Sequence, residues 1–337
     1  MRRHPAAAPP TRAASATVLV MLAIATTIAG CAPSRPARTP DGAVPAISST
    51  IRVRHNGRIE SVPMNDYAAA VALSEIAPGA VPEATAEALY EAQIIVARTY
   101  AASRRGRHGA EGFDLCDATH CQRYEAARLR TGRWAALART IAARTSRQVL
   151  VHDGRFIEAV FHADCGGHTA NARDVWGAAR AYLVAKRDDA PKPRGGDGGT
   201  AVHREWTSTL DAARLGAALA ADRRTRVELP VRDLTIASRD GSGRAARVRI
   251  TGGTSVDVQG DVFRAVVTAA LGLRAMPSTR FTIRRGRDGW DLAGTGFGHG
   301  VGLCQVGALA RARGGAKAAE ILRFYYPGAI IRRAGAG

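Results

Sequence analysis

The pattern of apolar and polar residues predicts short hairpins and helices over the first half of the chain. Residues 51–63 alternate in polarity on either side of Asn56-Gly57, a dipeptide typical of the tight turn of a β-hairpin. A helix is expected from about 66 to 76, with Asp66 as its N-cap and Pro78 beyond its end. Three further elements are expected here, helices over 82–103 and 133–144 and a second hairpin over 149–161.

The second half of the chain mixes helices and strands without a regular strand–helix–strand repeat. Residues 188–200, which are rich in proline and glycine, predict a loop or a boundary. Beyond them we expect helices near 210–221 and 261–271, strands at 231–237, 245–250 and 279–284, and a last helix over about 306–324. The predicted fold class is therefore α+β, a mixed catalytic domain of helices and short antiparallel strands with a smaller inserted α/β subdomain.

The chain is strongly basic, with 48 lysines and arginines against 29 aspartates and glutamates and a formal net charge of +19. A hydrophobic content of 46% excludes a wholly disordered chain, and the single short apolar run excludes a protein with many membrane spans. No helix-turn-helix, aromatic RNA-binding or zinc-finger spacing accompanies the charge. We therefore do not expect a nucleic acid as partner, and a polyanion outside the cell suits the charge better.

The N-terminus has the features of an exported protein. Arginines precede an uncharged apolar run over 16–29, which has the length of the hydrophobic region of a signal peptide. The run ends in small residues before Cys31, an arrangement similar to a bacterial lipobox, which predicts that Cys31 is lipidated. Residues 1–30 would then be a lipoprotein signal peptide and 31–48 a flexible tether. An ordinary secretory signal cleaved nearby is the alternative.

Glu75 is the first residue with a candidate chemical role. It lies within the apolar stretch 71–78, at the end of a predicted helix. Burial of a carboxyl group in apolar surroundings raises its pKa, which suits a general acid. On local sequence alone, a solvated glutamate without a catalytic role is the alternative.

Residues 106–124 are predicted to form a loop that is dense in metal-binding side chains. Cys116, His120 and Cys121 lie within six residues, and His108 lies a short way upstream. Thiolates and imidazoles at this density can hold a tetrahedral zinc ion. A disulfide between Cys116 and Cys121 is the alternative in an oxidising compartment, and the spacing alone does not separate the two.

Two glycine-bearing segments of the second half also carry polar side chains. In residues 162–168, a histidine and Cys165 precede two glycines, and a turn lining a cleft is favoured there over a thiol nucleophile or a second metal cluster. In residues 296–305, four glycines alternate with other residues before a helix, but no Lys-Ser/Thr follows as in a phosphate-binding loop. His299 and Gln305 are instead expected to present polar side chains to a cleft.

Short blocks of a known pattern occur in order over roughly residues 50–331. They are Val62-Pro63 to Tyr67, Ser74-Glu75-Ile76, Ala92-Gln93 with Val96 to Tyr100, Cys116-Asp117 with Cys121-Gln122 and Tyr124, Phe161-His162 with Cys165 to Gly167, Val175 to Gly177 with Tyr182-Leu183, Ser242 to Arg244, Phe263-Arg264, Ser278-Thr279 with Phe281, Gly298 to Gly302 with Gln305, and Tyr325 to Gly328. Together these blocks resemble the SpoIID/LytB family of bacterial cell-wall proteins. Met64-Asn65, where the family has Leu-Glu, and extra residues after Pro78 depart from its pattern.

The resemblance implies a lytic transglycosylase that cleaves peptidoglycan glycan strands. Glu75 matches the position of the family's catalytic glutamate, which would protonate the leaving oxygen and then accept the proton of the muramic C6 hydroxyl as a 1,6-anhydro ring closes. The residues expected to line the cleft and bind sugars are Arg98, Tyr100, Tyr124, His162, His299 and Gln305. Some members of the family bind zinc on the Cys/His loop, which implies a structural zinc ion here, held by His108, Cys116, His120 and Cys121. No organic cofactor is implied.

The predicted organisation has five parts: a signal peptide over 1–30, a tether over 31–48, a catalytic region over 49–190, an inserted subdomain over 191–290 and the C-terminal part of the catalytic domain over 291–332. The expected partners are glycan strands stripped of stem peptides, an N-acetylmuramoyl-L-alanine amidase, and the membrane through the lipid anchor. The expected location is the cell envelope, facing the periplasm or cell wall. The alternative function is a non-catalytic peptidoglycan-binding or amidase-enhancing protein, against which the presence of Glu75 speaks.

Overall fold

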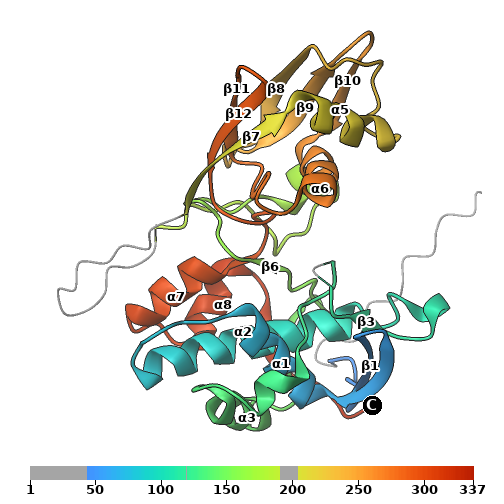
Figure 1. Ribbon diagram of the computed structural model, residues 1–337. Coiled ribbons are helices and arrows are strands. Elements are labelled where there is room, and N and C mark those ends of the chain that lie inside the picture. Colours follow the sequence, from blue (N-terminus) through green and yellow to red (C-terminus); the bar gives the residue numbers. More distant parts are fainter. Residues whose placement is uncertain (1–43, 119, 190–203) are drawn as a thin grey trace, which may run out of the picture. The chain divides into compact units, whose positions relative to one another are not determined.

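The computed structural model describes residues 44–118, 120–189 and 204–337 (Figure 1). The predicted signal peptide, Cys31, most of the tether and most of the predicted loop over 188–200 lie outside the described residues. Helices combine with small, mostly antiparallel sheets, which confirms the α+β class. Within the described ranges, no helix has both the length and the apolar character needed to cross a membrane.

The N-terminal hairpin forms as predicted. Strand β1 (Thr50–His55) pairs antiparallel with β2 (Arg58–Pro63). Asn56 and Gly57 form the turn between them, both with positive φ, as a two-residue hairpin turn requires. The short strand β3 (Leu115–Cys116) adds parallel to the other edge of β1, and this pairing places the start of the Cys/His loop beside the hairpin.

Three helices follow the hairpin: α1 (Met64–Glu75), α2 (Glu83–Ser103) and α3 (Ala135–Arg144). The predicted N-cap of α1 is wrong, because the helix starts at Met64 after Pro63 and Asp66 lies within its first turn. Buried alanines and Val71 occur all round α1, as in a helix that is enclosed by the core. Glu75 is its last residue, at the end of this enclosed helix.

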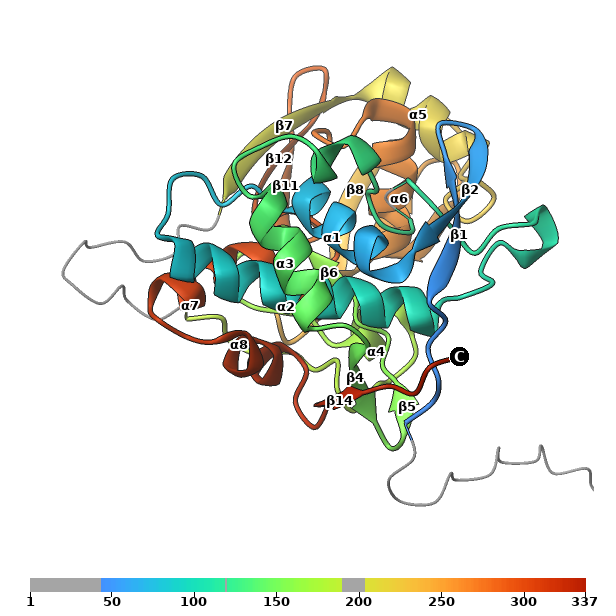
Figure 2. The ribbon, with the colours of Figure 1, turned by 90° about the horizontal axis from the view of Figure 1, so that it is seen from below.

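Buried side chains of residues 47–183 and 301–334 form one hydrophobic cluster, called the first cluster below, and helix α2 is its central helix. It contacts α1 and α3, and also α7 (Gln305–Arg313), α8 (Ala318–Tyr325) and β4 (Gln148–His152) (Figure 2). The single last helix predicted over about 306–324 is wrong, because Gly314 and Gly315 separate α7 from α8, and Gly315 has a positive φ that ends a helix. The remaining short elements of this part are η1 (Gly109–Glu111), η2 (Ala126–Leu129), β5 (Arg155–Phe156), α4 (Ala172–Trp176) and β14 (Ile330–Arg333).

Two short strands of this part lie side by side. Strand β6 (Phe161–His162) pairs parallel with β13 (Leu303–Cys304), although the two are far apart in sequence. The residues between these two strands include a second hydrophobic cluster, formed by buried side chains of residues 206–292.

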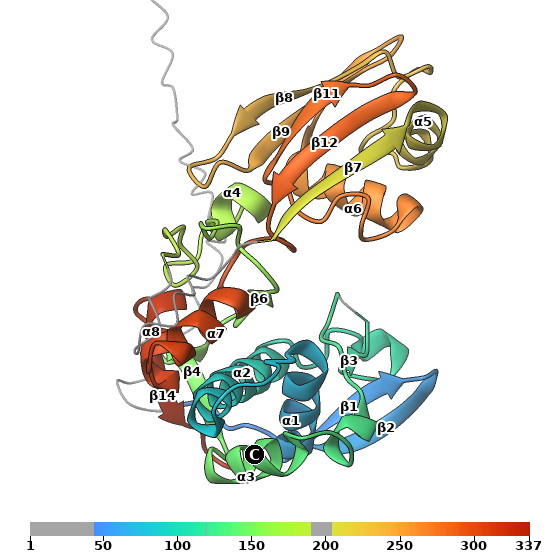
Figure 3. The same ribbon diagram turned by 60° about the vertical axis from the view of Figure 1, so that its left-hand side comes forward.

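The second cluster is built from two three-stranded antiparallel sheets and two helices (Figure 3). Its elements are β7 (Glu205–Asp211), α5 (Ala212–Ala221), β8 (Asp233–Arg239), β9 (Ala245–Thr251), β10 (Ser255–Gln259), α6 (Gly260–Leu271), β11 (Phe281–Arg285) and β12 (Gly289–Thr295). The sheet orders are β10-β9-β8 and β11-β12-β7. Both helices and three of these strands were predicted; β7, β10 and β12 were not, and β12 carries two glycines, which weaken a strand pattern.

Candidate functional site

Glu75 lies half-buried at the C-terminal end of α1. Its Oε1 accepts a hydrogen bond of 2.8 Å from the main-chain N–H of Arg123. Burial raises the pKa of the Glu75 carboxyl above its ordinary 4.5, and the hydrogen bond and charge of Arg123 oppose this rise only in part. A carboxyl group that keeps its proton to a higher pH than usual can act as a general acid.

The surroundings of Glu75 centre on Tyr67, a fully buried residue of α1. The hydroxyl of Tyr67 donates to Oε1 of Gln122 at 3.0 Å. The ring of Tyr124 stacks on that of Tyr67, with centroids 5.4 Å apart. Burial raises the pKa of Tyr67, and the charges of Cys121, Tyr100 and Glu75 add to the rise, so these groups surround one phenol.

The four predicted metal ligands converge. The donor atoms of His108, Cys116, His120 and Cys121 lie within 4.8 Å of one another. Nε2 of His120 is 3.3 Å from Sγ of Cys116 and 3.2 Å from Nε2 of His108, which is 3.4 Å from Sγ of Cys121. Tetrahedral zinc, with bonds of about 2.3 Å to sulfur and about 2.0 Å to nitrogen, separates its ligand atoms by roughly 3.3–3.8 Å. The donor set and its spacing therefore fit zinc.

One further observation supports a metal site over the alternative disulfide. Nδ1 of His108, the nitrogen that faces away from the other donors, is 2.6 Å from Oε1 of Glu111. A metal-bound histidine commonly donates its second N–H to a carboxylate in this way, which fixes the orientation of its ring.

The Cys/His loop connects these ligands directly to Glu75. Cys121 is followed by Gln122, which accepts from Tyr67, and by Arg123, which donates to Glu75. The Tyr100 hydroxyl donates to the carbonyl of His120 at 3.4 Å. Hydrogen bonds at His120 and Gln122 thus join the loop to α2 and α1 on either side of Cys121.

Two other predicted residues, His299 and His162, are neighbours. The ring of His299 lies 5.5 Å from that of His162 and 5.1 Å from that of Trp176. Nδ1 of His299 accepts from the main-chain N–H of Val301, and burial lowers the pKa of His299 to about 3, so its imidazole is neutral near pH 7. Gln305 is half-buried at the start of α7. His299 thus offers a neutral imidazole beside the partly exposed indole of Trp176.

Comparisons with known proteins show similarity over most of the chain. The family model for stage II sporulation protein, SpoIID, matches residues 54–152, which include Glu75 and the four candidate ligands. An uncharacterized protein of Brachyspira hyodysenteriae is 30% identical over 274 residues, 81% of this chain and 67% of that protein. The chain belongs to the SpoIID/LytB family.

Two named relatives from Bacillus subtilis match most of this SpoIID/LytB chain. Stage II sporulation protein D is 26% identical over 301 residues, 83% of this chain and 78% of the relative. The amidase enhancer is 26% identical over 297 residues, 77% of this chain but 40% of the relative, so the chain spans less than half of that protein. A domain of unknown function (DUF8618) matches residues 194–302, the region of the second hydrophobic cluster.

The structure corrects the expected position of Arg98 in this SpoIID/LytB chain. Arg98 is fully buried, with 0% of its surface exposed. Its guanidinium donates to the carbonyls of Gln148 and Ala142 and to Oδ1 of Asn65. A side chain that is enclosed and bonded in this way cannot hold a sugar, so the prediction that Arg98 lines the cleft is wrong. It joins α2 to α3 and to β4.

Burial also changes the expected roles of three other residues. Tyr100 and Tyr124 are 6% and 5% exposed, and their rings pack beside the loop rather than face solvent. His162 is buried, and its Nδ1 donates to the carbonyl of Val301 at 3.1 Å. These three buried residues pack within the protein and are not placed to contact a ligand. His299 and Gln305 are half-buried and remain candidates for direct contact with a ligand.

Sequence reasoning missed the two contacts that position the acid. Gln122 and Tyr124 appear in a family block, but nothing in the pattern indicated that Gln122 bonds to Tyr67. The donor to Glu75 is the main-chain N–H of Arg123, which every residue except proline possesses. No residue type at position 123 could therefore have revealed this contact.

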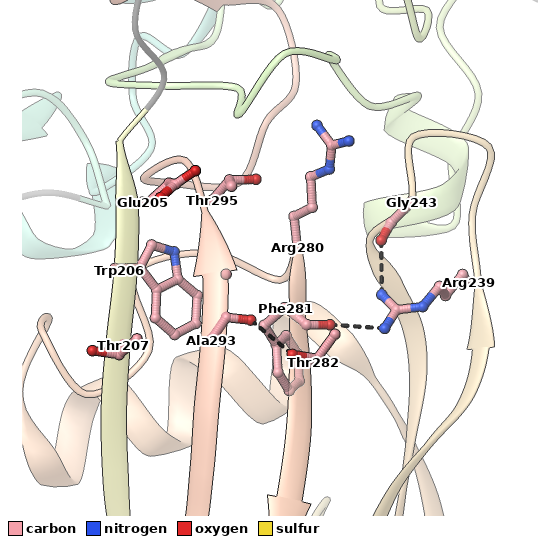
Figure 4. A pocket seen from close by; sticks show the side chains of 11 residues that line it. Glu205, Trp206, Thr207, Arg239, Gly243, Arg280, Phe281, Thr282, Ala293 and Thr295 are labelled. Atoms are coloured by element: carbon pink, nitrogen blue, oxygen red, sulfur yellow. Dashed lines mark hydrogen bonds between the residues drawn. The ribbon is translucent and has the colours of Figure 1, made fainter.

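A hollow of about 830 Å³ lies on strands of the second cluster (Figure 4). It is lined by Trp206 and Phe281 with Arg239 and Arg280, and by none of the residues predicted to carry function. Arg239 already donates to the carbonyls of Gly243 and Phe281, as the dashed lines show. Arg280 donates to the carbonyl of Gly166. These arginines hold the main chain in place, so the hollow is not the candidate site.

Proposed function

We propose that this SpoIID/LytB protein is a peptidoglycan lytic transglycosylase that uses Glu75 first as general acid and then as general base. The observation that carries the proposal is the half-buried Glu75 carboxyl, with its raised pKa, held by the Arg123 amide at the end of a buried helix. The printed names of two relatives, stage II sporulation protein D and amidase enhancer, support a role at the cell wall.

The reaction needs one carboxyl group. Glu75 gives its proton to the oxygen that bridges MurNAc and GlcNAc, and the bond from that oxygen to C1 of MurNAc breaks. The C6 hydroxyl oxygen of the same MurNAc then bonds to C1, and its proton passes to the Glu75 carboxylate. The products are a free GlcNAc hydroxyl and a 1,6-anhydroMurNAc end. No water enters, so the second carboxyl group of an ordinary glycosidase is not required.

The surrounding residues prepare Glu75 for both steps. Oε1 accepts from Arg123, which leaves Oε2 to carry the proton in our proposal. Burial favours the protonated acid at the start, and the Arg123 amide stabilises the carboxylate that forms after proton transfer. His299 and Gln305, both half-buried, would hydrogen-bond the sugars, and the exposed face of Trp176 would contact a sugar ring.

A structural zinc ion would be held by His108, Cys116, His120 and Cys121. Four protein ligands leave no open coordination position, so the ion would fix the loop rather than react. The four ligands would fix the course of the backbone from Cys121 to Arg123. They would thereby fix the position of the Arg123 N–H that donates to Glu75. The site would thus support the acid from two residues away along the chain.

The location of the protein follows from the same proposal. A signal peptide over 1–30 and a lipidated Cys31 would place the mature chain at the envelope, next to its substrate. Without the three arginines of residues 1–30, the formal net charge falls from +19 to +16, which suits an anionic envelope rather than a nucleic acid. The division into a tether over 31–48, a catalytic region over 49–190 and 291–332, and a subdomain over 191–290 is part of this proposal.

The test compares wild type with Glu75→Gln on purified glycan strands, with and without stem peptides. The amide is close to the size of the carboxyl but cannot donate the acid proton. We expect the release of 1,6-anhydro ends, measured by mass spectrometry, to fall at least about 100-fold, the usual contribution of a general acid. Glu83→Gln, an exposed residue in the first turn of α2, is the matched control and should keep full activity. Equal rates for Glu75→Gln and wild type would sink the proposal.

A non-catalytic role as an amidase enhancer is the second candidate, favoured by the name of the relative that matches 77% of this chain. The same measurement separates the two roles. A wall-binding protein would release no anhydro ends from glycan, whether or not stem peptides are present. It would instead increase the release of stem peptides when an N-acetylmuramoyl-L-alanine amidase is added, and Glu75→Gln would leave that increase unchanged.

A further inference from the structure

Two buried cysteines meet next to the paired strands β6 and β13, which precede and follow the second cluster in sequence. Cys165 lies just after β6, and Cys304 ends β13, 139 positions later. Their sulfur atoms are within 4.8 Å of each other, and the main-chain N–H of Cys165 donates to Sγ of Cys304 at 3.2 Å. Both residues are 0% exposed. Neither is part of the candidate acid or of the Cys/His loop.

The surroundings of the two thiols can accept a bond between them. Sγ of Cys304 accepts hydrogen bonds from the main-chain N–H groups of Cys165 and Gly307, and neither of these bonds uses the thiol proton of Cys304. Sγ of Cys165 donates to Oδ2 of Asp188 at 3.2 Å. If that proton is lost, Asp188 still accepts from the Tyr325 hydroxyl at 2.7 Å and from the buried guanidinium of Arg311 at 2.5 Å. No buried polar group would lose its last partner.

A metal ion is the other chemistry open to this pair, since a donor atom of His162 lies within the same 4.8 Å. Structural zinc takes four protein ligands, whereas this group supplies three among the residues described. The guanidinium of Arg244 is buried here, donates to the carbonyl of Cys165 and interacts with both thiols. A positive charge in a buried position opposes a second cation beside it. The pair therefore suits a disulfide better than a metal.

We propose that Cys165 and Cys304 form a disulfide in the exported protein. This inference rests on the export that belongs to the proposed function, because disulfides persist in oxidising compartments. Two S–H bonds break and one S–S bond forms, and the two electrons and two protons pass to the disulfide of a thiol-disulfide oxidant, which becomes a dithiol. The new bond ties β6 to the start of α7 and closes a loop that contains the whole second cluster.

The test is a peptide map of the full chain, produced with its own N-terminus and recovered from the cell envelope. The cells are lysed and the protein is unfolded in the presence of the alkylating reagent and without reductant, and it is then digested with trypsin. We expect peptides 156–173 and 288–311 to appear linked, two hydrogen atoms lighter than their sum, and to separate on reduction. Peptide 108–123, which carries Cys116 and Cys121, should appear alkylated at both residues in the same digest. Full alkylation of Cys165 and Cys304 would overturn the proposal.

A second measurement asks what the bond does. The Tm of the wild type should fall by about 5 °C or more when a phosphine reductant is added, as expected for a cross-link that closes a long loop. The double variant Cys165→Ser, Cys304→Ser should have a Tm that the reductant does not change. Two alkylated cysteines together with a second equivalent of zinc would replace the disulfide by a metal site. The transglycosylase assay on Glu75→Gln is independent of all these outcomes.

Discussion

Replacement of Arg98 by methionine separates a structural role from a role in binding sugar. Three acceptors bond the guanidinium, at 3.1, 3.2 and 3.1 Å. Each hydrogen bond from a charged donor is worth about 1.5–3 kcal/mol, so losing three costs roughly 4–9 kcal/mol. Burial lowers the pKa of Arg98 from 12.5 to about 10, which corresponds to about 3 kcal/mol of desolvation that methionine would recover. We expect a net loss of about 3 kcal/mol in the free energy of unfolding.

Urea denaturation measures this loss, and the exposed Arg139 of α3 supplies the control. Arg139→Met should change the free energy of unfolding by less than about 0.5 kcal/mol, as is usual at an exposed position. The folded fraction of Arg98→Met should bind glycan with a KM close to that of the wild type. A variant of unchanged stability whose KM rises at least tenfold would refute the reasoning and restore Arg98 to the cleft.

Two further predictions concern the acid and the loop. Because the pKa of Glu75 is raised above 4.5, activity that needs its protonated form should persist above pH 4.5 and decline as the pH rises through the pKa of the folded protein. A rate that is constant from pH 4 to pH 9 would contradict this assignment. Removal of one zinc ligand in His108→Ala should lower bound zinc from about one equivalent to less than a tenth and reduce activity with it, whereas His152→Ala should change neither; elemental analysis and the anhydro-sugar assay are the measurements.

Features that depend on neighbouring residues in sequence were predictable. The Asn56-Gly57 turn and its hairpin are specified locally, because few other dipeptides adopt positive φ twice in succession. The metal ligands lie between His108 and Cys121, so a short loop was enough to suggest that they converge. Gly314-Gly315 is a local signal for the break between α7 and α8, and the prediction of one helix over about 306–324 did not use it.

Features that depend on distant contacts were not predictable. The acceptors of Arg98 on Ala142 and Gln148 are 44 and 50 positions away, and nothing on α2 itself indicates that they are there. The prediction that Arg98 lines the cleft came from the family resemblance, and because a charged residue on a helix is usually exposed, nothing in the sequence spoke against it. The same limit applies to Glu75, whose donor is 48 positions away and belongs to the main chain.

The contact between Arg123 and Glu75 depends on the backbone geometry of the loop. A main-chain donor is insensitive to the side chain at position 123 but sensitive to the path of the backbone. That path is fixed on one side by Cys121 and by the bond from Gln122 to Tyr67, both within two residues of the donor. A shift of the loop by even 1 Å would lengthen a 2.8 Å hydrogen bond beyond its effective range and leave the carboxyl without its partner. The Cys/His group and Tyr67 are therefore expected to affect the position of Glu75 through the backbone that donates to it.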